Sequence, residues 1–250
     1  MKKLFTVLAA ACALSGLFTA GAVFAEGPDL PPAPINTHDT ASLQAGARTF
    51  VNYCLNCHGA GMVRYNSLEG LGLTDQQIRD NLLFTAGKVG EMMSVGLTRA
   101  DGKAFFNAAP PDLSVEARVR GADWLYAYLR GFYSDPTTTT GWNNVVFPHV
   151  AMPHALWQLQ GVRTLVQDKP AEGAVESAVH TPRFETVVPG TLSPVEYDAT
   201  VRDLVNYLVW MGEPHQALRK QIGFWALFVL GIMIVLTWLL KKEFWKDVPH

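Results

Sequence analysis

The stretch Cys54-Leu55-Asn56-Cys57-His58 decides the fold and the chemistry expected of this chain. Two thiols three residues apart, followed at once by an imidazole, form the attachment pattern of a c-type haem. The two intervening residues let one helical turn span the gap between the porphyrin vinyl groups that the thiols attack. His58 then falls one turn after Cys54, so we expect it to be the proximal ligand of the iron.

Two other uses of a Cys-x-x-Cys pair lack the context that they need. A redox dithiol is expected beside a βαβ pattern, which the surrounding sequence does not show. A structural zinc site needs four ligands, and no second cysteine pair completes the tetrahedron. The third cysteine, Cys12, lies in the N-terminal segment. The sequence therefore predicts one covalently bound haem c, held by Cys54 and Cys57.

The N-terminal 25 residues have the pattern of a cleaved secretory signal. Lys2 and Lys3 precede an apolar run, and Val23-Phe24-Ala25 places small residues where signal peptidase cuts, so we expect cleavage after Ala25. An uncleaved N-terminal anchor is the alternative, and this small-residue exit disfavours it. Export agrees with haem attachment, which takes place outside the bacterial cytoplasm.

A six-coordinate haem needs a second axial ligand, and the proline-flanked stretch 147–154 offers Met152. A thioether at this position stabilises ferrous iron and raises the potential, which suits an electron carrier. Methionine fills protein cores more often than it ligates, so the residues alone leave competitors open. These are Met62, Met92, Met93, Met211, His149 and His154.

Several helices can be expected from periodicity and capping signals. One runs from about Ala41 into the haem motif with Gly46, Phe50 and Cys54 on one face, and Gly46 would let a second helix approach closely. Ser193-Pro194-Val195-Glu196 is a strong helix start, and the helix from there to about Gly212 should cross the first.

The remaining segments give weaker signals. The proline-rich residues 26–39 should be extended, and Thr74 with Gln77 indicates a capping box that opens a helix through about residue 84. Residues 86–112 look like a loop, and a helix is expected over 122–130. Two β-branched runs, 163–166 and 184–188, make a hairpin plausible around a polar loop.

The C-terminal region predicts a membrane anchor. Residues 222–240 carry no charge, and at ~1.5 Å per residue they span about 28 Å, close to the thickness of a bilayer core. Basic residues bracket this run, with Trp225 and Trp238 near its ends. We expect a haem domain over 26–218 outside the cytoplasm, an anchor over 219–241 and a cytoplasmic tail over 242–250.

These features together resemble the cytochrome c1 family of bacterial type, the haem subunit of the cytochrome bc1 complex (ubiquinol–cytochrome c reductase). The resemblance covers nearly all of the mature chain. It rests on Gly46, Phe50, Cys54, Cys57 and His58, on Pro110-Pro111-Asp112-Leu113-Ser114, on Arg118 and Arg120, on Met152-Pro153, on Trp210 with Glu213-Pro214, and on the C-terminal anchor.

The resemblance implies a mostly α fold, namely an enlarged cytochrome c-like haem domain with a single C-terminal transmembrane helix. It also implies that Met152 is the sixth iron ligand, that Arg120 pairs with a haem propionate and that Pro111 belongs to the haem pocket. A guanidinium fork suits a carboxylate partner. These roles come from the family and not from the spacing of the residues.

The function implied is a one-electron relay in a respiratory chain. A Rieske iron–sulfur protein, working with cytochrome b, would reduce this haem, and the haem would reduce a soluble cytochrome c. The chain alone would then be no enzyme, although the complex, expected to be dimeric, is an oxidoreductase. Two alternatives are a free-standing membrane-anchored cytochrome c that serves an oxidase or a periplasmic reductase, and a haem enzyme or gas sensor with an open iron site.

The charge of the expected haem domain bears on its partners. Residues 26–218 hold 13 Lys and Arg against 20 Asp and Glu, a net charge of −7, whereas the whole chain has a net charge of −2. An acidic surface would steer a basic cytochrome c, although such a charge also serves solubility alone. Nothing in this balance suggests nucleic acid as a partner.

Overall fold

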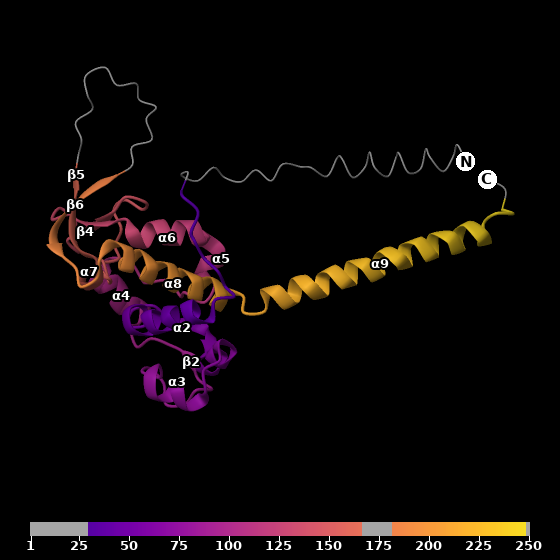
Figure 1. The fold of residues 1–250 in the computed structure, drawn as a ribbon, viewed down its shortest axis with the longest axis horizontal. Helices are drawn as coiled ribbons and strands as arrows, with labels where there is room; N and C mark the ends of the chain where they lie inside the picture. The colour runs from indigo at the N-terminus through magenta and orange to yellow at the C-terminus, as the bar shows by residue number, and fades with distance from the viewer. Residues whose placement is uncertain (1–29, 167–181, 249–250) are drawn as a thin grey trace, which may run out of the picture. The chain divides into compact units, whose positions relative to one another are not determined.

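The computed structural model describes residues 30–166 and 182–248. The predicted signal segment 1–25 and most of the polar loop between the two hairpin strands therefore lie outside the described residues. The described part is mostly helical, with three small antiparallel sheets of two strands each (Figure 1). This agrees with the predicted fold class.

The elements follow one another from the N-terminal side of the domain to the anchor. The helices are α2 (Thr40–Thr49), η1 (Phe50–Cys54), η2 (Tyr65–Leu71), α3 (Asp75–Asn81), α4 (Arg99–Phe106), α5 (Glu116–Arg120), α6 (Ala122–Arg130), α7 (Trp157–Gln160), α8 (Pro194–Gly212) and α9 (Gln216–Phe244). The strands pair as β1 (Ala60–Arg64) with β2 (Met92–Met93), β3 (Phe132–Ser134) with β4 (Trp142–Asn144), and β5 (Gly161–Val166) with β6 (Arg183–Pro189).

Helices α2 and α8 pack face to face, as the sequence predicted, and this packing anchors the haem motif. A Cβ atom on Gly46 would lie 2.7 Å from the Cβ of Tyr207, so only glycine permits this approach. Next to it, the rings of Phe50 and Tyr207 lie 5.6 Å apart. The hydroxyl of Ser42 donates to Asp203 at 2.7 Å, which adds a polar tie at the same crossing.

The haem motif begins on a π-helical turn rather than on the continuous α-helix that the sequence suggested. The amide of Leu55 donates to the carbonyl of Phe50, five residues back, and η1 is the result. Such turns are frequent at functional sites. One further turn places the amide of His58 2.9 Å from the carbonyl of Cys54. The expected spacing of one turn between these two residues is confirmed.

Other local predictions are also confirmed. Capping boxes close the N-termini of α3 at Thr74 and of α8 at Ser193, and α6 spans the expected 122–130. Strands β5 and β6 form the expected hairpin, with a register shift between Val162 and Arg163. Helices α5 and α6 pack against α8, and the buried side chains of α8 form part of the hydrophobic core.

The prediction that residues 86–112 form a loop was wrong. This segment holds β2 and the helix α4, whose N-cap Thr98 accepts from the amide of Asp101. The sequence did not predict this helix because it contains Gly102, and glycine has a low helix propensity. The structure requires it, since a Cβ there would lie 2.7 Å from the ring of Pro110. Helix α3 also ends at Asn81, earlier than the expected residue 84.

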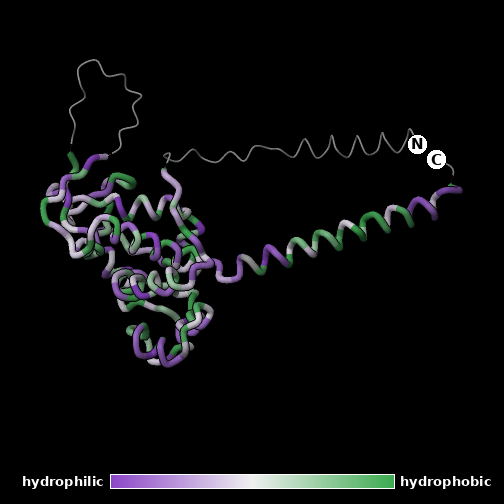
Figure 2. Tube along the Cα trace, in the orientation of Figure 1, coloured by the Kyte–Doolittle hydropathy of each residue, from purple (hydrophilic) through white to green (hydrophobic). Residues whose placement is uncertain are grey.

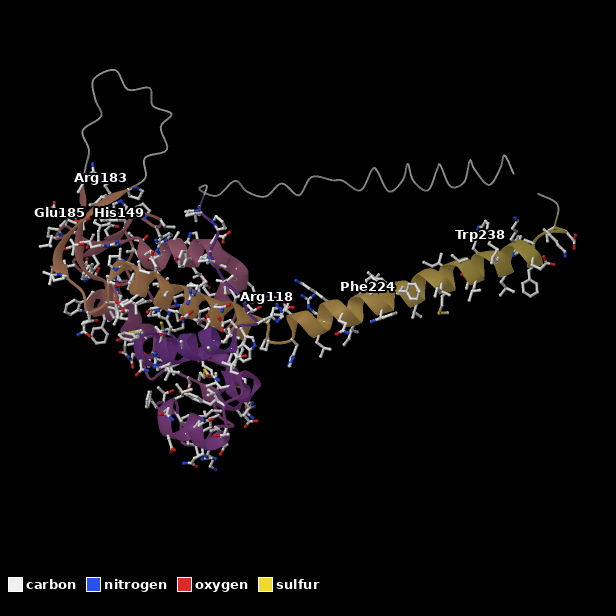
Figure 3. The ribbon with its side chains drawn as sticks, in the orientation of Figure 1. Arg118, His149, Arg183, Glu185, Phe224 and Trp238 are labelled. Atoms are coloured by element: carbon white, nitrogen blue, oxygen red, sulfur yellow. The ribbon has the colours of Figure 1, made fainter. Side chains whose placement is uncertain are left out.

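Helix α9 carries the predicted apolar run. The segment Leu218–Phe244 is long and apolar enough to cross a membrane, and its most apolar 18 residues have a mean hydropathy of 2.4. Figure 2 shows the hydrophobic middle of α9 between hydrophilic ends. Phe224 and Trp238 project from it (Figure 3), and Lys242 lies over the Trp238 ring at 5.5 Å from its centroid. The helix is longer than the 222–240 run, because its polar ends continue the same hydrogen-bond ladder.

Candidate functional site

One cavity of about 270 Å³ brings together every site residue that the sequence predicted. These are Cys54, Cys57, His58, Pro111, Arg120 and Met152. The remaining walls are mostly apolar and come from α6, α8 and the segments before α5 and α7. They include Leu113, Leu125, Leu129, Val150, Leu204 and Leu208. Arg120 and Glu116 are the charged residues of the lining, so a largely apolar group with a polar edge would suit it.

The two cysteines are unpaired and half-buried at the cavity wall. Burial, with a smaller effect of Cys57, raises the pKa of the Cys54 thiol to about 12, and burial also raises the pKa of Cys57. Thiols with raised pKa values are poor redox nucleophiles at neutral pH, which does not favour a dithiol oxidoreductase. Among residues 30–166 and 182–248, no three His, Cys, Asp or Glu side chains gather into a metal-binding cluster.

His58 is held in one tautomer. Its Nδ1 lies 2.8 Å from the carbonyl oxygen of Pro111, and a carbonyl can only accept, so Nδ1 carries the proton. Burial lowers the pKa of the imidazole, against the opposing effects of Pro111, Glu116 and Asp112. The ring is therefore neutral near pH 7 and Nε2 keeps a free lone pair. This is the arrangement that a metal-ligating histidine requires.

Three hydrogen bonds join the segment after the haem motif to the segment that contains Pro111. The amide of Leu113 donates to the carbonyl of Gly59 at 2.8 Å, and the amide of Gly61 donates to Oδ2 of Asp112 at 2.7 Å. The amide of Met62 donates to Oγ of Ser114 at 3.0 Å. This explains the Pro-Pro-Asp-Leu-Ser motif physically, because it fixes the carbonyl that orients His58.

Asp112 acts as an anion in this contact. Partial burial raises its pKa, but hydrogen bonds from Ser114 and Gly61 and the nearby His58 outweigh that effect, so the pKa lies below its ordinary range. An acceptor-only carboxylate can serve both the Gly61 amide and the Ser114 amide, which donates to Oδ1 at 2.9 Å. The role of Asp112 could not be predicted from the sequence motif alone.

Met152 lines the cavity on a loop that two asparagines hold in place. Asn144 is almost fully buried, its Nδ2 donates to the carbonyl of Tyr128, and its Oδ1 accepts from the amides of Val146 and Phe147. Asn143 is buried beside it. Its Oδ1 accepts from the amide of His149 at 2.9 Å. These side chains shape the turn that leads to Met152.

Tyr128 is the residue of the site that sequence reasoning missed. Its hydroxyl donates to Sδ of Met152 over 3.3 Å. Burial raises the pKa of the phenol well above its ordinary value, with only a small opposing effect from Arg120, so it remains a donor. Trp124 and Tyr128 lie four residues apart on one face of α6, and this aromatic pair could have revealed it.

The competing ligands do not reach the cavity. Among the described residues, Met152 is the only methionine and His58 the only histidine in its lining. Met62 is 73% exposed, whereas Met93 and Met211 are core residues. His154 stacks on Phe132 with ring centroids 4.8 Å apart, and burial lowers its pKa to about 4. It is a neutral core histidine.

Arg120 lies at the edge of the cavity and is half exposed. Its Nε donates to Glu116 at 3.2 Å, and its guanidinium lies over the ring of Trp124, 4.8 Å from the centroid. Arg118, the other arginine of α5 named in the resemblance, instead reaches Gly212 at the end of α8 (Figure 3). Arg120 is therefore the arginine of this pair that the fold directs to the cavity.

Comparisons with known proteins agree with this geometry. The model of the Cytochrome C1 family matches residues 32–171 and 190–248. The chain belongs to the cytochrome c1 family. It is 42% identical to a cytochrome c1 of Allochromatium vinosum over 249 residues, which is 99% of this chain and 100% of that protein.

Other relatives fall on either side of that identity. The chain is similar to a protein of Nitrosomonas europaea named ammonia monooxygenase gamma subunit, at 47% identity over 88% of each chain. A cytochrome c1 of Rhodospirillum rubrum is 29% identical over 85% of this chain and 84% of its own length. Cytochrome c1 is a haem c protein, and membership makes this chain the electron-transferring haem subunit of a bc1 complex, anchored by its apolar C-terminal helix. The free-standing cytochrome is not favoured.

Proposed function

We propose that residues 26–218 hold one haem c, attached covalently through Cys54 and Cys57 and ligated by His58 and Met152. The observation that carries this proposal is a single mostly apolar cavity lined by both thiols, a neutral imidazole and a thioether. Soft sulfur and nitrogen donors suit haem iron, and the walls suit a porphyrin. When bound, the haem supplies an iron that accepts and releases one electron.

The residues around the cavity suit a haem that carries electrons. The Pro111 carbonyl presents Nε2 of His58 as a ligand, and Tyr128 holds the sulfur of Met152. Two strong side-chain ligands would leave no open iron position, which argues against a haem enzyme or gas sensor. Arg120, with a half-exposed guanidinium, is the candidate partner of a haem propionate.

We further propose the place of this haem in the relay. It would receive an electron from a Rieske iron–sulfur protein that works with cytochrome b, and it would pass the electron to a soluble cytochrome c, in a dimeric complex held in membrane lipid. The net charge of −7 over residues 26–218 supports a basic acceptor, because opposite charges raise association rates.

The orientation follows from the same features. The expected signal cleavage after Ala25 would place residues 26–218 on the periplasmic side of the bacterial inner membrane. The anchor would occupy 219–241, and the tail 242–250 would lie in the cytoplasm, because Lys241, Lys242 and Lys246 favour that side.

Purification in mild detergent tests this function. The chain should elute with a b-type cytochrome and a Rieske protein, and a quinol should reduce its haem in that fraction. A haem-loaded chain that elutes free of both partners, and that quinol does not reduce in the membrane, would contradict the assignment to a bc1 complex.

A further inference from the structure

Tyr128 donates a hydrogen bond to the sulfur of Met152, the residue proposed as an iron ligand. It lies in the last turn of α6, and its side chain lines the cavity. Its hydroxyl donates to Sδ of Met152 at 3.3 Å. Tyr128 is only 9% exposed, so water competes poorly for its hydroxyl.

The ring of Tyr128 is fixed by its neighbours on both sides. The ring of Trp124 stacks on it at 4.7 Å with an interplanar angle of 11°. The ring of Phe132 meets it edge-on at 5.1 Å and 68°. Offset-stacked and edge-to-face pairs are the favoured aromatic geometries, and Trp124 lies one turn before Tyr128 on α6, where it can stack on the ring. The hydroxyl is therefore aimed by packing and not by chance rotation.

The backbone of Tyr128 is tied to the same loop as its hydroxyl. Its carbonyl accepts from Nδ2 of Asn144 at 2.8 Å, and Asn144 shapes the turn that precedes Met152. One residue thus contacts the Met152 loop at two points. A change in the position of α6 would move the loop and the hydroxyl together, which keeps the short contact to the sulfur.

A thioether sulfur has two lone pairs, and a hydrogen bond engages one of them. We propose that Tyr128 is a positioning residue, which fixes the lone pair that Met152 offers to the cavity and weakens the sulfur as a donor. A weaker donor stabilises ferric iron less, so the hydroxyl raises the potential of the haem. This proposal rests on the proposed role of Met152 as a ligand.

Replacement of Tyr128 by Phe tests the proposal in the full chain, purified with its complex. The variant keeps the ring and its stacking and loses only the hydroxyl. At a fixed applied potential, we expect the ferrous-to-ferric ratio to fall about two- to fivefold, as for the loss of one weak hydrogen bond. The near-infrared methionine–iron charge-transfer band of the ferric form should shift but persist.

Tyr197→Phe is the matched control. Tyr197 is 2% exposed, and its hydroxyl donates at 2.8 Å to the carbonyl of Leu129, the residue next to Tyr128 on α6. The variant Tyr197→Phe also loses a buried hydroxyl, but this residue touches neither proposed ligand. The midpoint potential of the haem in Tyr197→Phe should stay at the wild-type value. An equal shift in both variants, or no shift in Tyr128→Phe, would overturn the role of the Tyr128 hydroxyl.

Met152→Leu separates this inference from the function on which it rests. If the near-infrared band survives in Met152→Leu, another residue ligates the iron, and the proposed ligand set fails with the inference. If the band disappears in Met152→Leu while Tyr128→Phe retains the wild-type potential and band, only the inference about Tyr128 fails.

Discussion

The two sides of the cavity that carry the proposed axial ligands are built in different ways. His58 follows the cysteines directly, and three hydrogen bonds between residues 59–62 and 112–114, each with a backbone amide donor, hold its partner Pro111. Met152 lies almost a hundred residues further on, in a loop shaped by buried side chains. The first side is specified by two short motifs, whereas the second depends on tertiary packing.

This difference predicts different responses to mutation. The histidine side contains surface groups, because Pro111 and Asp112 are exposed, so water can replace part of what a substitution removes. The methionine side relies on Asn144 and Tyr128, which are buried, so a lost hydrogen bond there leaves an unsatisfied group. The methionine side should therefore be the more fragile of the two.

Met152→Leu should have the largest effect. Leucine has nearly the volume of methionine and no lone pair, so packing is kept while the ligand is lost. We expect a large fall in midpoint potential and a high-spin component in the ferric spectrum. Met62→Leu, at an exposed position, is the control and should leave the spectrum and the potential unchanged. An unchanged potential in Met152→Leu would show that Met152 does not ligate the iron.

Asn144→Ala should rank second. The substitution deletes one donated and two accepted hydrogen bonds at a position that is 1% exposed. We expect the free energy of unfolding to fall by about 2–4 kcal/mol, and the methionine–iron band to weaken as the turn loosens. Denaturant titration of the haem domain measures the first effect. Asn81→Ala, which removes an exposed bond within α3, is the control and should cost well under half as much.

Asp112→Ala should have a smaller effect on the histidine side. It removes the acceptor for the amides of Gly61 and Ser114, but solvent can reach this site. We expect a loss of about 1 kcal/mol in unfolding free energy and a potential shift smaller than that of Met152→Leu. Asp80→Ala, at an exposed carboxylate that accepts from Gln76, is the matched variant. If Asp112→Ala lost more unfolding free energy than Asn144→Ala, the histidine side would be the more fragile of the two.

The N-terminus of α8 should give the smallest effect, because α8 carries neither ligand. The Ser193 amide and hydroxyl donate to Glu196, and these bonds lower the pKa of its carboxyl group. Stability from the carboxylate is therefore present above the ordinary pKa of a glutamate and is lost as the pH falls through the lowered value. The small difference in stability between wild type and Glu196→Gln should vanish in acid, with equal midpoint potentials throughout. A difference that grows in acid would contradict this sign.

The histidine side could be predicted from the sequence because its information is local. The haem motif is recognisable from the spacing of Cys54, Cys57 and His58. Gly46 indicates a close helix crossing. The bond from His58 to Pro111 could not be derived from spacing, since 53 residues separate the partners. Helix α4 was missed because its glycine, needed beside Pro110, lowers the helical signal.

The methionine side was predicted only as far as Met152 itself. From the residues alone, six other side chains competed with it, because nothing local distinguishes a ligating methionine from a core one. The fold decides which side chain reaches the cavity, through Asn143 and Asn144, whose side-chain hydrogen bonds have no sequence signature. The hydrogen bond from Tyr128 to Met152 could not be derived from the sequence, because 24 residues separate the two partners.

The central claim is that the haem is bound to this chain through Cys54 and Cys57, and acid–acetone extraction tests it most directly. We expect the pigment of the purified chain to stay with the polypeptide, and the replacement of both cysteines by alanine to abolish this retention. Extraction of the pigment from the wild-type chain into the acetone phase would contradict the claim.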